Sequence, residues 1–226
     1  MARPVHIASA ARSLHGYLHG PADRRPGVLF IHGLHSTQSG YRERAEAVAA
    51  ELGAVCLTFD LGGHGESEGR REGLALADHL ADVTAAYDRL VAERDVDPGR
   101  VGVAGASYGG YLAAMLTARR PVARLAIRAP ALYADADLHA PPAARGRPGA
   151  GTGGNAALAA VRGFAGPLLV VESGADEVVP ATTVRAYVEA APHAEHVIME
   201  GVEHALHRPQ WRADFLARLI AFFRGL

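Results

Sequence analysis

Cysteine is almost absent from this chain of 226 residues. The single cysteine, Cys56, lies in the apolar run AVCLTF, so an intrachain disulfide is excluded and we interpret Cys56 as a buried, inert thiol. The sequence also lacks an apolar stretch long enough to cross a bilayer, and its first twenty residues lack the continuous apolar segment of a signal peptide. A reducing compartment fits these absences, and we expect a cytoplasmic protein.

The chain also has no marked excess of positive or negative charge. The 23 lysines and arginines are balanced by 24 aspartates and glutamates, which gives a formal net charge of −1 at pH 7. Because the arginines are spread among acidic residues, the sequence shows no electrostatic footprint for nucleic acid or for an anionic membrane. We therefore expect a small-molecule substrate, no nucleic acid partner and no membrane partner. The sequence does not define the oligomeric state.

Short apolar runs alternate with segments of helical spacing along the whole chain. The runs of strand length are 28–32, 54–59, 101–104, 125–129, 168–171 and 196–199. The segments with helical spacing or helix-forming composition are 41–52, 73–94, 108–119, 180–190 and the stretch around 211–222. Strands that are apolar throughout, placed between amphipathic helices, predict an α/β fold with a mostly parallel sheet covered by helices on both faces. Residues 5–19 predict an antiparallel hairpin at one edge of this sheet.

One serine stands among small residues at a predicted junction of strand and helix. The segment VGVAGASYGG, residues 101–110, matches the pattern G-x-S-x-G around Ser107. With 26 glycines in the chain, a chance match is expected roughly one time in ten, so the string alone is weak. Its context is stronger, because Gly105 and Gly109 would let the strand and the helix approach without side-chain collision. We interpret the segment as a nucleophile elbow.

A serine hydroxyl needs a general base and a group that orients this base. For this arrangement the acid should follow a later strand and the histidine a still later one. Asp176 follows the run 168–171, and His204 follows the run 196–199. Both would lie in loops at the carboxyl ends of strands, where parallel sheets present their ligands. The competing candidates are Glu177 for the acid and His193, His196 and His207 for the base.

The chain resembles the α/β-hydrolase superfamily, especially compact bacterial serine esterases and dienelactone-hydrolase-like proteins. The resemblance covers residues 28–224 and rests on five segments in the family's order: FIHGLHST, FDLGGHGESEG, GASYGG, SGADEVVP and GVEHAL. It implies the α/β-hydrolase fold, with a sheet of about eight strands in the order 1-2-4-3-5-6-7-8. Dienelactone hydrolases carry a cysteine where this chain has Ser107, so ring opening of dienelactones is not implied.

The resemblance also implies roles for individual residues. Ser107, Asp176 and His204 would form the catalytic triad, and the backbone N–H groups of Leu34 and Tyr108 would form the oxyanion hole. No cofactor is implied, because the sequence has neither a Walker lysine nor a Rossmann glycine pattern. No metal site is implied, because no set of ligands with metal-binding spacing accompanies the histidines.

The resemblance further implies that His32 and His64 are structural. His35 and Tyr133 are expected beside the substrate. Residues 1–226 are expected to form one domain, with a short cap or lid excursion at about 133–160. The part of this excursion up to Asn155 is rich in alanine, glycine and proline, which predicts a reduced lid and an open site.

The predicted activity is hydrolysis of carboxylic esters of small to medium acyl groups through an acyl-enzyme on Ser107. Because the triad does not encode the leaving group, a thioesterase or an amidase or peptidase would use the same residues. A ligand-binding protein that keeps the elbow without turnover is the alternative from a different class.

Overall fold

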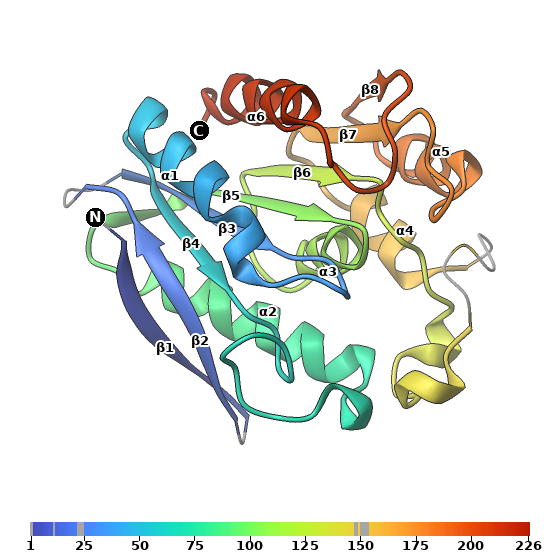
Figure 1. Ribbon diagram of the computed structural model, residues 1–226, viewed down its shortest axis with the longest axis horizontal. Helices are drawn as coiled ribbons and strands as arrows, with labels where there is room; N and C mark the ends of the chain where they lie inside the picture. The colour runs from blue at the N-terminus through green and yellow to red at the C-terminus, as the bar shows by residue number, and fades with distance from the viewer. Residues whose placement is uncertain (1, 11, 22–24, 147–148, 150–153) are drawn as a thin grey trace.

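An eight-stranded sheet forms the centre of the molecule (Figure 1). The computed structural model describes residues 2–10, 12–21, 25–146, 149 and 154–226. The strands within these residues are β1 (Arg3–Ser9), β2 (Arg12–His19), β3 (Arg25–Ile31), β4 (Val55–Phe59), β5 (Val96–Ala106), β6 (Arg124–Arg128), β7 (Leu168–Ser173) and β8 (Ala194–Met199). Their order is β1-β2-β4-β3-β5-β6-β7-β8, which confirms the order implied by the resemblance.

The sheet is parallel except at one edge. Strands β1 and β2 pair antiparallel as the predicted hairpin, and β2 pairs antiparallel with β4. All pairings from β4 through β3, β5, β6 and β7 to β8 are parallel. The predicted α/β class with a mostly parallel sheet is therefore confirmed.

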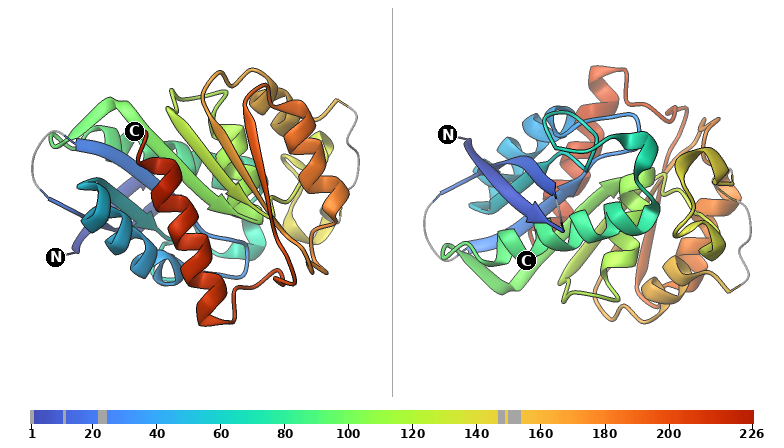
Figure 2. Two further views of the ribbon diagram at one scale, coloured as in Figure 1. Left: turned by 90° about the horizontal axis from the view of Figure 1, so that it is seen from above. Right: turned by 90° about the horizontal axis from the view of Figure 1, so that it is seen from below.

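Helices cover both faces of the sheet. They are α1 (Arg42–Leu52), α2 (Leu76–Val91), α3 (Tyr108–Leu116), α4 (Ala156–Arg162), α5 (Ala181–Ala190) and α6 (Pro209–Phe223). Helices α1 and α6 lie over one face, and α2 to α5 lie over the other (Figure 2). Short 3₁₀ helices occur at Gln38–Tyr41, Arg71–Gly73, Asp135–Asp137 and Pro142–Ala144.

The apolar strands supply a core on each face because successive side chains of a strand point to opposite sides. In β3, Leu29 and Ile31 pack into the core beneath α2 and α3, whereas Val28 and Phe30 pack into the core beneath α1 and α6. Helix α2 shows the matching helical pattern. Its buried apolar residues are Leu76, Leu80, Val83, Ala86, Tyr87 and Leu90. The apolar residues that recur with helical spacing in the sequence are thus the ones that α2 buries against the sheet.

The loop excursion after β6 is compact where the structure describes it. Tyr133 is buried, the two short 3₁₀ helices at 135–137 and 142–144 follow, and α4 begins after its cap residue Asn155. The Asn155 side chain accepts hydrogen bonds from two backbone N–H groups at the start of α4. Residues 147–148 and 150–153 of the predicted lid lie outside the described residues.

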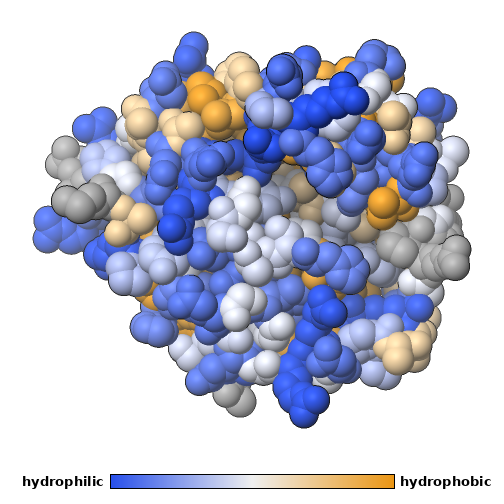
Figure 3. All heavy atoms as spheres, in the orientation of Figure 1, coloured by the Kyte–Doolittle hydropathy of each residue, from blue (hydrophilic) through white to orange (hydrophobic). Residues whose placement is uncertain are grey.

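The surface is mostly polar on the face in view. Figure 3 shows hydrophilic residues over most of this face, with apolar residues gathered in small groups. In the described ranges, no helix combines the length and apolar character that a membrane crossing requires.

Candidate active site

Ser107 occupies a sharp turn between β5 and α3. Its backbone has φ 54° and ψ −120°, a left-handed conformation that is strained for a residue with a side chain. Hydrogen bonds to the end of β6 and to the segment after it hold this turn: Ser107 N–H donates to the Arg128 carbonyl at 2.9 Å, and Ala131 N–H donates to the Ser107 carbonyl at 3.0 Å. The surrounding backbone therefore fixes the position of the hydroxyl group.

Two glycines make this turn possible, as the sequence predicts. A Cβ atom added at Gly105 would overlap the carbonyl group of Gly109. A Cβ atom added at Gly109 would overlap the carbonyl oxygens of Ile31 and His32. In both cases the obstacle is backbone, which cannot swing aside as a flexible side chain does. The close approach of β3, β5 and α3 therefore requires glycine at both positions.

Asp176 and His204 form a hydrogen-bonded pair in the loops after β7 and β8. His204 Nδ1 lies 2.8 Å from Asp176 Oδ2, and the other carboxylate oxygen accepts the backbone N–H groups of Val178 and Val179, each at 2.8 Å. Burial alone would raise the pKa of Asp176, but the hydrogen bond from His204 and the two backbone bonds outweigh it and lower this pKa. An ionised carboxylate only accepts, so Nδ1 of His204 donates to Asp176, and in the neutral ring Nε2 is then the acceptor.

The competing residues lie elsewhere. Glu177 is exposed, as are His193 and His207. His196 lies in β8 and its Nε2 atom is 2.9 Å from Glu172 Oε2. Among the described residues, no group of three or more His, Cys, Asp or Glu side chains is arranged to hold a metal ion.

Ser107 and His204 line one cavity of about 540 Å³. The loop after β3 contributes Leu34 and His35 to its wall, and the excursion after β6 contributes Tyr133. Residues that were predicted from four separate segments of the sequence therefore line the same cavity. Asp176 lies behind His204, with only 5% of its side chain exposed.

The two backbone N–H groups predicted for the oxyanion hole belong to anchored peptide units. In a trans peptide the C=O and N–H bonds point in opposite directions, so fixing the carbonyl fixes the N–H. The Gly33 carbonyl, which shares a peptide with Leu34 N–H, accepts from Ser36 N–H at 3.1 Å and from His32 Nδ1 at 2.8 Å. The Ser107 carbonyl, which shares a peptide with Tyr108 N–H, accepts from Tyr111 N–H and Ala131 N–H.

A cluster of buried rings, His32, His64, His79 and Tyr108, supports these peptides. Neighbouring ring centroids in this order are 5.1, 5.5 and 5.6 Å apart. His64 Nε2 lies 2.8 Å from the Leu34 carbonyl, and Tyr108 OH lies 2.7 Å from His79 Nδ1. Burial lowers the pKa of His32 to about 3 and that of His79 to about 4. Both rings are therefore neutral at neutral pH.

Sequence reasoning missed three arginines that line the cavity, namely Arg44, Arg128 and Arg212. Arg128 leaves a signal in the sequence, since it is the one charged residue in the otherwise apolar run 125–129. Arg44 and Arg212 lie on helices, where a charged residue is usual. Two arginines, Arg145 and Arg147, lie in the predicted lid. Arg145 is half-buried and donates to the backbone carbonyls of Leu74 and Ala140. The other, Arg147, lies outside the described residues.

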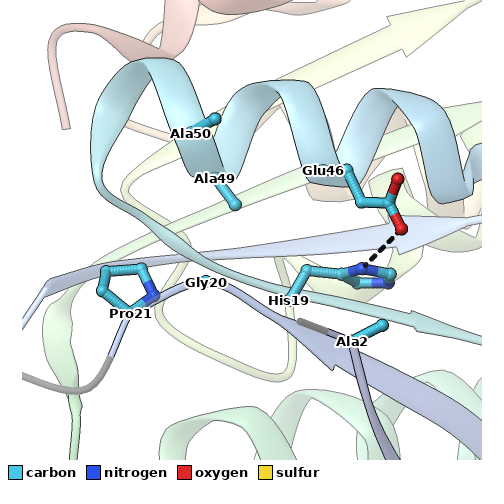
Figure 4. A pocket seen from close by; sticks show the side chains of 7 residues that line it. All are labelled: Ala2, His19, Gly20, Pro21, Glu46, Ala49 and Ala50. Atoms are coloured by element: carbon cyan, nitrogen blue, oxygen red, sulfur yellow. Dashed lines mark ion pairs between the residues drawn. The ribbon is translucent and has the colours of Figure 1, made fainter.

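A second cavity, of about 470 Å³, lies between β2 and α1 (Figure 4). Its polar feature is the contact between His19 Nδ1 and Glu46 Oε1 at 3.7 Å, which is an ion pair only when the imidazole is protonated, and burial lowers the pKa of His19. Small residues such as Ala49 form much of the remaining wall. None of the residues assigned above to the candidate site lines it.

The fold is that of an α/β hydrolase. Residues 22–146, more than half of the chain, match the family described as serine aminopeptidase, S33. The chain belongs to this family of hydrolases. The crystal structure of the α/β hydrolase GrgF from Penicillium sp. sh18 has a TM-score of 0.82 with 16% sequence identity, covering 100% of this chain and 98% of that one.

Curated relatives are similar over part of their length. The uncharacterized protein Rv2307c of Mycobacterium tuberculosis is 33% identical over 184 residues, which are 79% of this chain and 63% of the relative. The human mitochondrial palmitoyl-protein thioesterase ABHD10 is 32% identical over 113 residues, which are 50% of this chain and 35% of the relative. The alignments thus span less than two thirds of the length of either relative.

Proposed function

We propose that this protein is a serine hydrolase that cleaves carboxylic esters of small to medium acyl groups, with Ser107, Asp176 and His204 as its triad. The observation that carries the proposal is that Ser107, held in a strained elbow, faces the same cavity as an imidazole whose far nitrogen is bonded to a carboxylate. A base with one fixed tautomer beside a positioned hydroxyl is the arrangement that activates serine.

In the proposed reaction, His204 Nε2 takes the proton of the Ser107 hydroxyl as Oγ attacks the acyl carbonyl. The proton then passes from His204 to the leaving alkoxide, and the acyl group stays on Oγ. Water, deprotonated by the same nitrogen, attacks the acyl-enzyme and releases the acid. Asp176 stabilises the imidazolium that forms in each half-reaction. General acid–base catalysis of this kind contributes about 10²–10⁴ in rate.

The backbone N–H groups of Leu34 and Tyr108 would stabilise the tetrahedral oxyanion. Their peptides are already anchored through the Gly33 and Ser107 carbonyls, so these donors would not have to reorganise as charge develops. Loss of one such donor reduces turnover by about 10²–10³. His35 and Tyr133 line the cavity and are proposed to contact the substrate.

A thioester is the second candidate substrate. The chain shares 32% identity over 113 residues with ABHD10, whose name gives palmitoyl-protein thioesterase activity. The description of the matching family, serine aminopeptidase, makes an amide or peptide bond a further bond type to test. As part of the same proposal, residues 1–226 act as one domain in the cytoplasm, and the excursion at 133–160 forms a short cap over the cavity.

Covalent labelling tests the nucleophile directly. The protein is incubated with a fluorophosphonate and the modified peptide is mapped by mass spectrometry. We expect one label on Ser107, lost in Ser107→Ala and strongly reduced in His204→Ala. Ser36→Ala is the matched control, because Ser36 is a second serine in the wall of the same cavity and its loss should leave the label on Ser107. A folded protein without a label on Ser107 would favour the ligand-binding alternative.

A substrate panel then distinguishes the leaving groups. Turnover of p-nitrophenyl esters, the matching thioesters and the matching anilides is compared for acyl chains of increasing length. The proposal predicts the highest kcat/KM for an ester of a short or medium chain, with no loss of activity in EDTA. A preference for thioesters selects the second candidate. Full ester turnover by Ser107→Ala would refute the assigned mechanism.

A further inference from the structure

The cavity beside Ser107 has positive charges and no negative one in its wall. Arg44 of α1, Arg128 at the end of β6 and Arg212 of α6 all line it, and within the described residues no aspartate or glutamate does. We call these three residues the arginine cluster. No ion pair joins any member of the cluster to a carboxylate in the described part of the chain.

Arg128 is the most deeply buried member. Its residue is only 6% exposed, its Nη1 atom donates to Ser173 Oγ at 2.7 Å, and its Nη2 atom donates to the His204 carbonyl at 2.7 Å. These partners are neutral, and Nε has no hydrogen-bond partner among the described residues. A buried guanidinium without a counter-ion is unfavourable, because burial removes the water that would otherwise stabilise its charge.

Arg44 and Arg212 reach the same cavity from the two helices on one face of the sheet. Arg44 donates to the Gly40 carbonyl at 2.7 Å, and Arg212 donates to the His207 carbonyl at 2.8 Å. The guanidinium carbons of Arg44 and Arg128 both lie 5.7 Å from the Phe215 ring centroid, so Phe215 is a shared wall between them. Backbone carbonyls and aromatic faces orient these charges without neutralising them.

The members of the cluster repel one another. Burial lowers the pKa of Arg44, and the charge of Arg212 lowers it further. Burial also lowers the pKa of Arg128, with Arg44 adding to the effect. The acids that act on them are Glu43, which is outside the cavity wall, and Asp176, which is engaged by His204. An anion in the cavity would relieve this repulsion.

We propose that the arginine cluster binds a carboxylate of the substrate, so that the preferred substrates are esters or thioesters carrying a free carboxylate on their acyl or alcohol part. This inference rests on the proposed hydrolytic function of Ser107. The planar guanidinium fork matches a carboxylate in two parallel hydrogen bonds. The rest of the cavity wall, with Leu34, Tyr133 and Phe215, would contact the apolar chain between the carboxylate and the reacting carbonyl.

Arg128 has a second role that the test must avoid. Its bond to the His204 carbonyl ties it to the loop that carries the proposed base, so a change at Arg128 would alter the position of His204 as well. Arg44 makes no bond to this loop, so it is the main position at which the inference is tested. Arg212 donates to the Leu206 and His207 carbonyls of the same loop, so its variant is judged by the ratio of the two esters and not by the rate with either one.

The first experiment compares a charged substrate with a neutral one. The p-nitrophenyl monoester of adipic acid carries a free carboxylate, and its methyl-capped counterpart does not. We expect kcat/KM to be about tenfold or more higher for the charged ester, a factor that corresponds to about 1.4 kcal/mol. We expect this preference to fall several-fold in Arg44→Gln and in Arg212→Gln, and to be largely kept in Arg44→Lys.

Arg218→Gln is the matched control, because Arg218 is on α6 like Arg212 but pairs with Asp214 and does not line the cavity. It should leave the preference for the charged ester unchanged. The preference in the unmodified protein should also decrease as the NaCl concentration rises, since salt screens charge interactions. Circular dichroism melting curves establish that each variant is folded.

The second experiment does not depend on turnover. Ser107→Ala protein is titrated by calorimetry with monomethyl adipate, which is an anion, and with dimethyl adipate, which is neutral. We expect the anion to bind at least several-fold more tightly, and this difference to be lost when Arg44→Gln and Arg212→Gln are added.

The outcomes separate the two proposals. Neutral ester turnover that requires Ser107, together with no preference for the charged ester and no tighter binding of the anion, would refute the carboxylate site and leave the serine hydrolase in place. Tighter binding of monomethyl adipate that depends on Arg44 and Arg212, without any labelling of Ser107, would refute the hydrolase and keep the anion site.

Discussion

Replacing the buried His79 by glutamine should make the stability of the protein less dependent on pH. The His79 ring is fully buried, its Nε2 atom lies 3.0 Å from the Gly62 carbonyl and its Nδ1 atom accepts from Tyr108 OH. A glutamine amide offers one donor and one acceptor to the same partners but does not titrate. The variant therefore removes the proton-binding site while keeping a polar side chain in place.

The magnitude follows from the difference in pKa between the folded and unfolded states. Burial lowers the pKa of His79 from 6.5 to about 4, so between these values the unfolded state binds a proton that the folded state does not. Stability consequently falls as the pH drops from about 6.5 towards about 4. At 1.36 kcal/mol per pH unit, this group contributes a loss of about 2 kcal/mol by about pH 5 and about 3 kcal/mol in total.

The assay is urea denaturation of both proteins at about pH 7, 6 and 5. His79→Gln should have a lower free energy of unfolding at neutral pH, but its loss of stability between about pH 7 and about pH 5 should be smaller than that of the unmodified protein by about 2 kcal/mol. His139→Gln removes an exposed histidine and controls for the loss of one imidazole. Equal pH dependence of stability in His79→Gln and the unmodified protein would refute the assignment of a neutral, buried His79.

Three further predictions concern the elbow, the acid and the lid. Gly109→Ala should lower the free energy of unfolding by at least about 3 kcal/mol or prevent folding, whereas Gly73→Ala, where a Cβ meets nothing within 4 Å, should change it by less than about 1 kcal/mol in the same urea titration. Asp176→Asn should reduce kcat for a p-nitrophenyl ester by about 10³–10⁴-fold with a small change in KM, and an unchanged kcat would contradict its role. Asn155→Ala should lower stability by about 1–2 kcal/mol, measured by thermal melting, because it removes the cap of α4 and a 2.6 Å bond to the Tyr133 carbonyl.

The fold was predictable from the sequence because the strongest local signals and the tertiary structure agree. The apolar runs 28–32, 54–59, 125–129 and 168–171 fall on β3, β4, β6 and β7, since fully buried parallel strands need apolar residues on both faces. The strand β5 is an exception: it begins at Val96, five residues before the predicted run. Val96 is buried, but residues 97–100 are partly or fully exposed, and the register shifts where β5 pairs with the start of β3, so periodicity gives no signal there.

The proposed triad residues and their order along the chain were predictable from the sequence, but the other residues of the cavity wall were predictable only in part. Ser107, Asp176 and His204 each follow a strand, and the carboxyl ends of parallel strands meet at one edge of the sheet. The arginine cluster carries no such signal, because Arg44 and Arg212 reach the cavity from two helices that are far apart in the sequence. Helix α4 was missed because it is short and follows a stretch rich in glycine and proline.

The buried histidines link the stability of the fold to the proposed oxyanion hole. His32 can donate from Nδ1 to the Gly33 carbonyl only while Nε2 accepts from Leu61 N–H, 3.0 Å away, so the ring must be neutral and must carry its proton on Nδ1. Adding a proton at Nε2 would place two N–H groups against each other and leave Leu61 N–H buried without an acceptor. The peptide that bears Leu34 N–H would then lose the support of a fixed His32 ring. The low pKa of His32, about 3, thus keeps both the core and the proposed oxyanion donor intact over the pH range in which the triad would act.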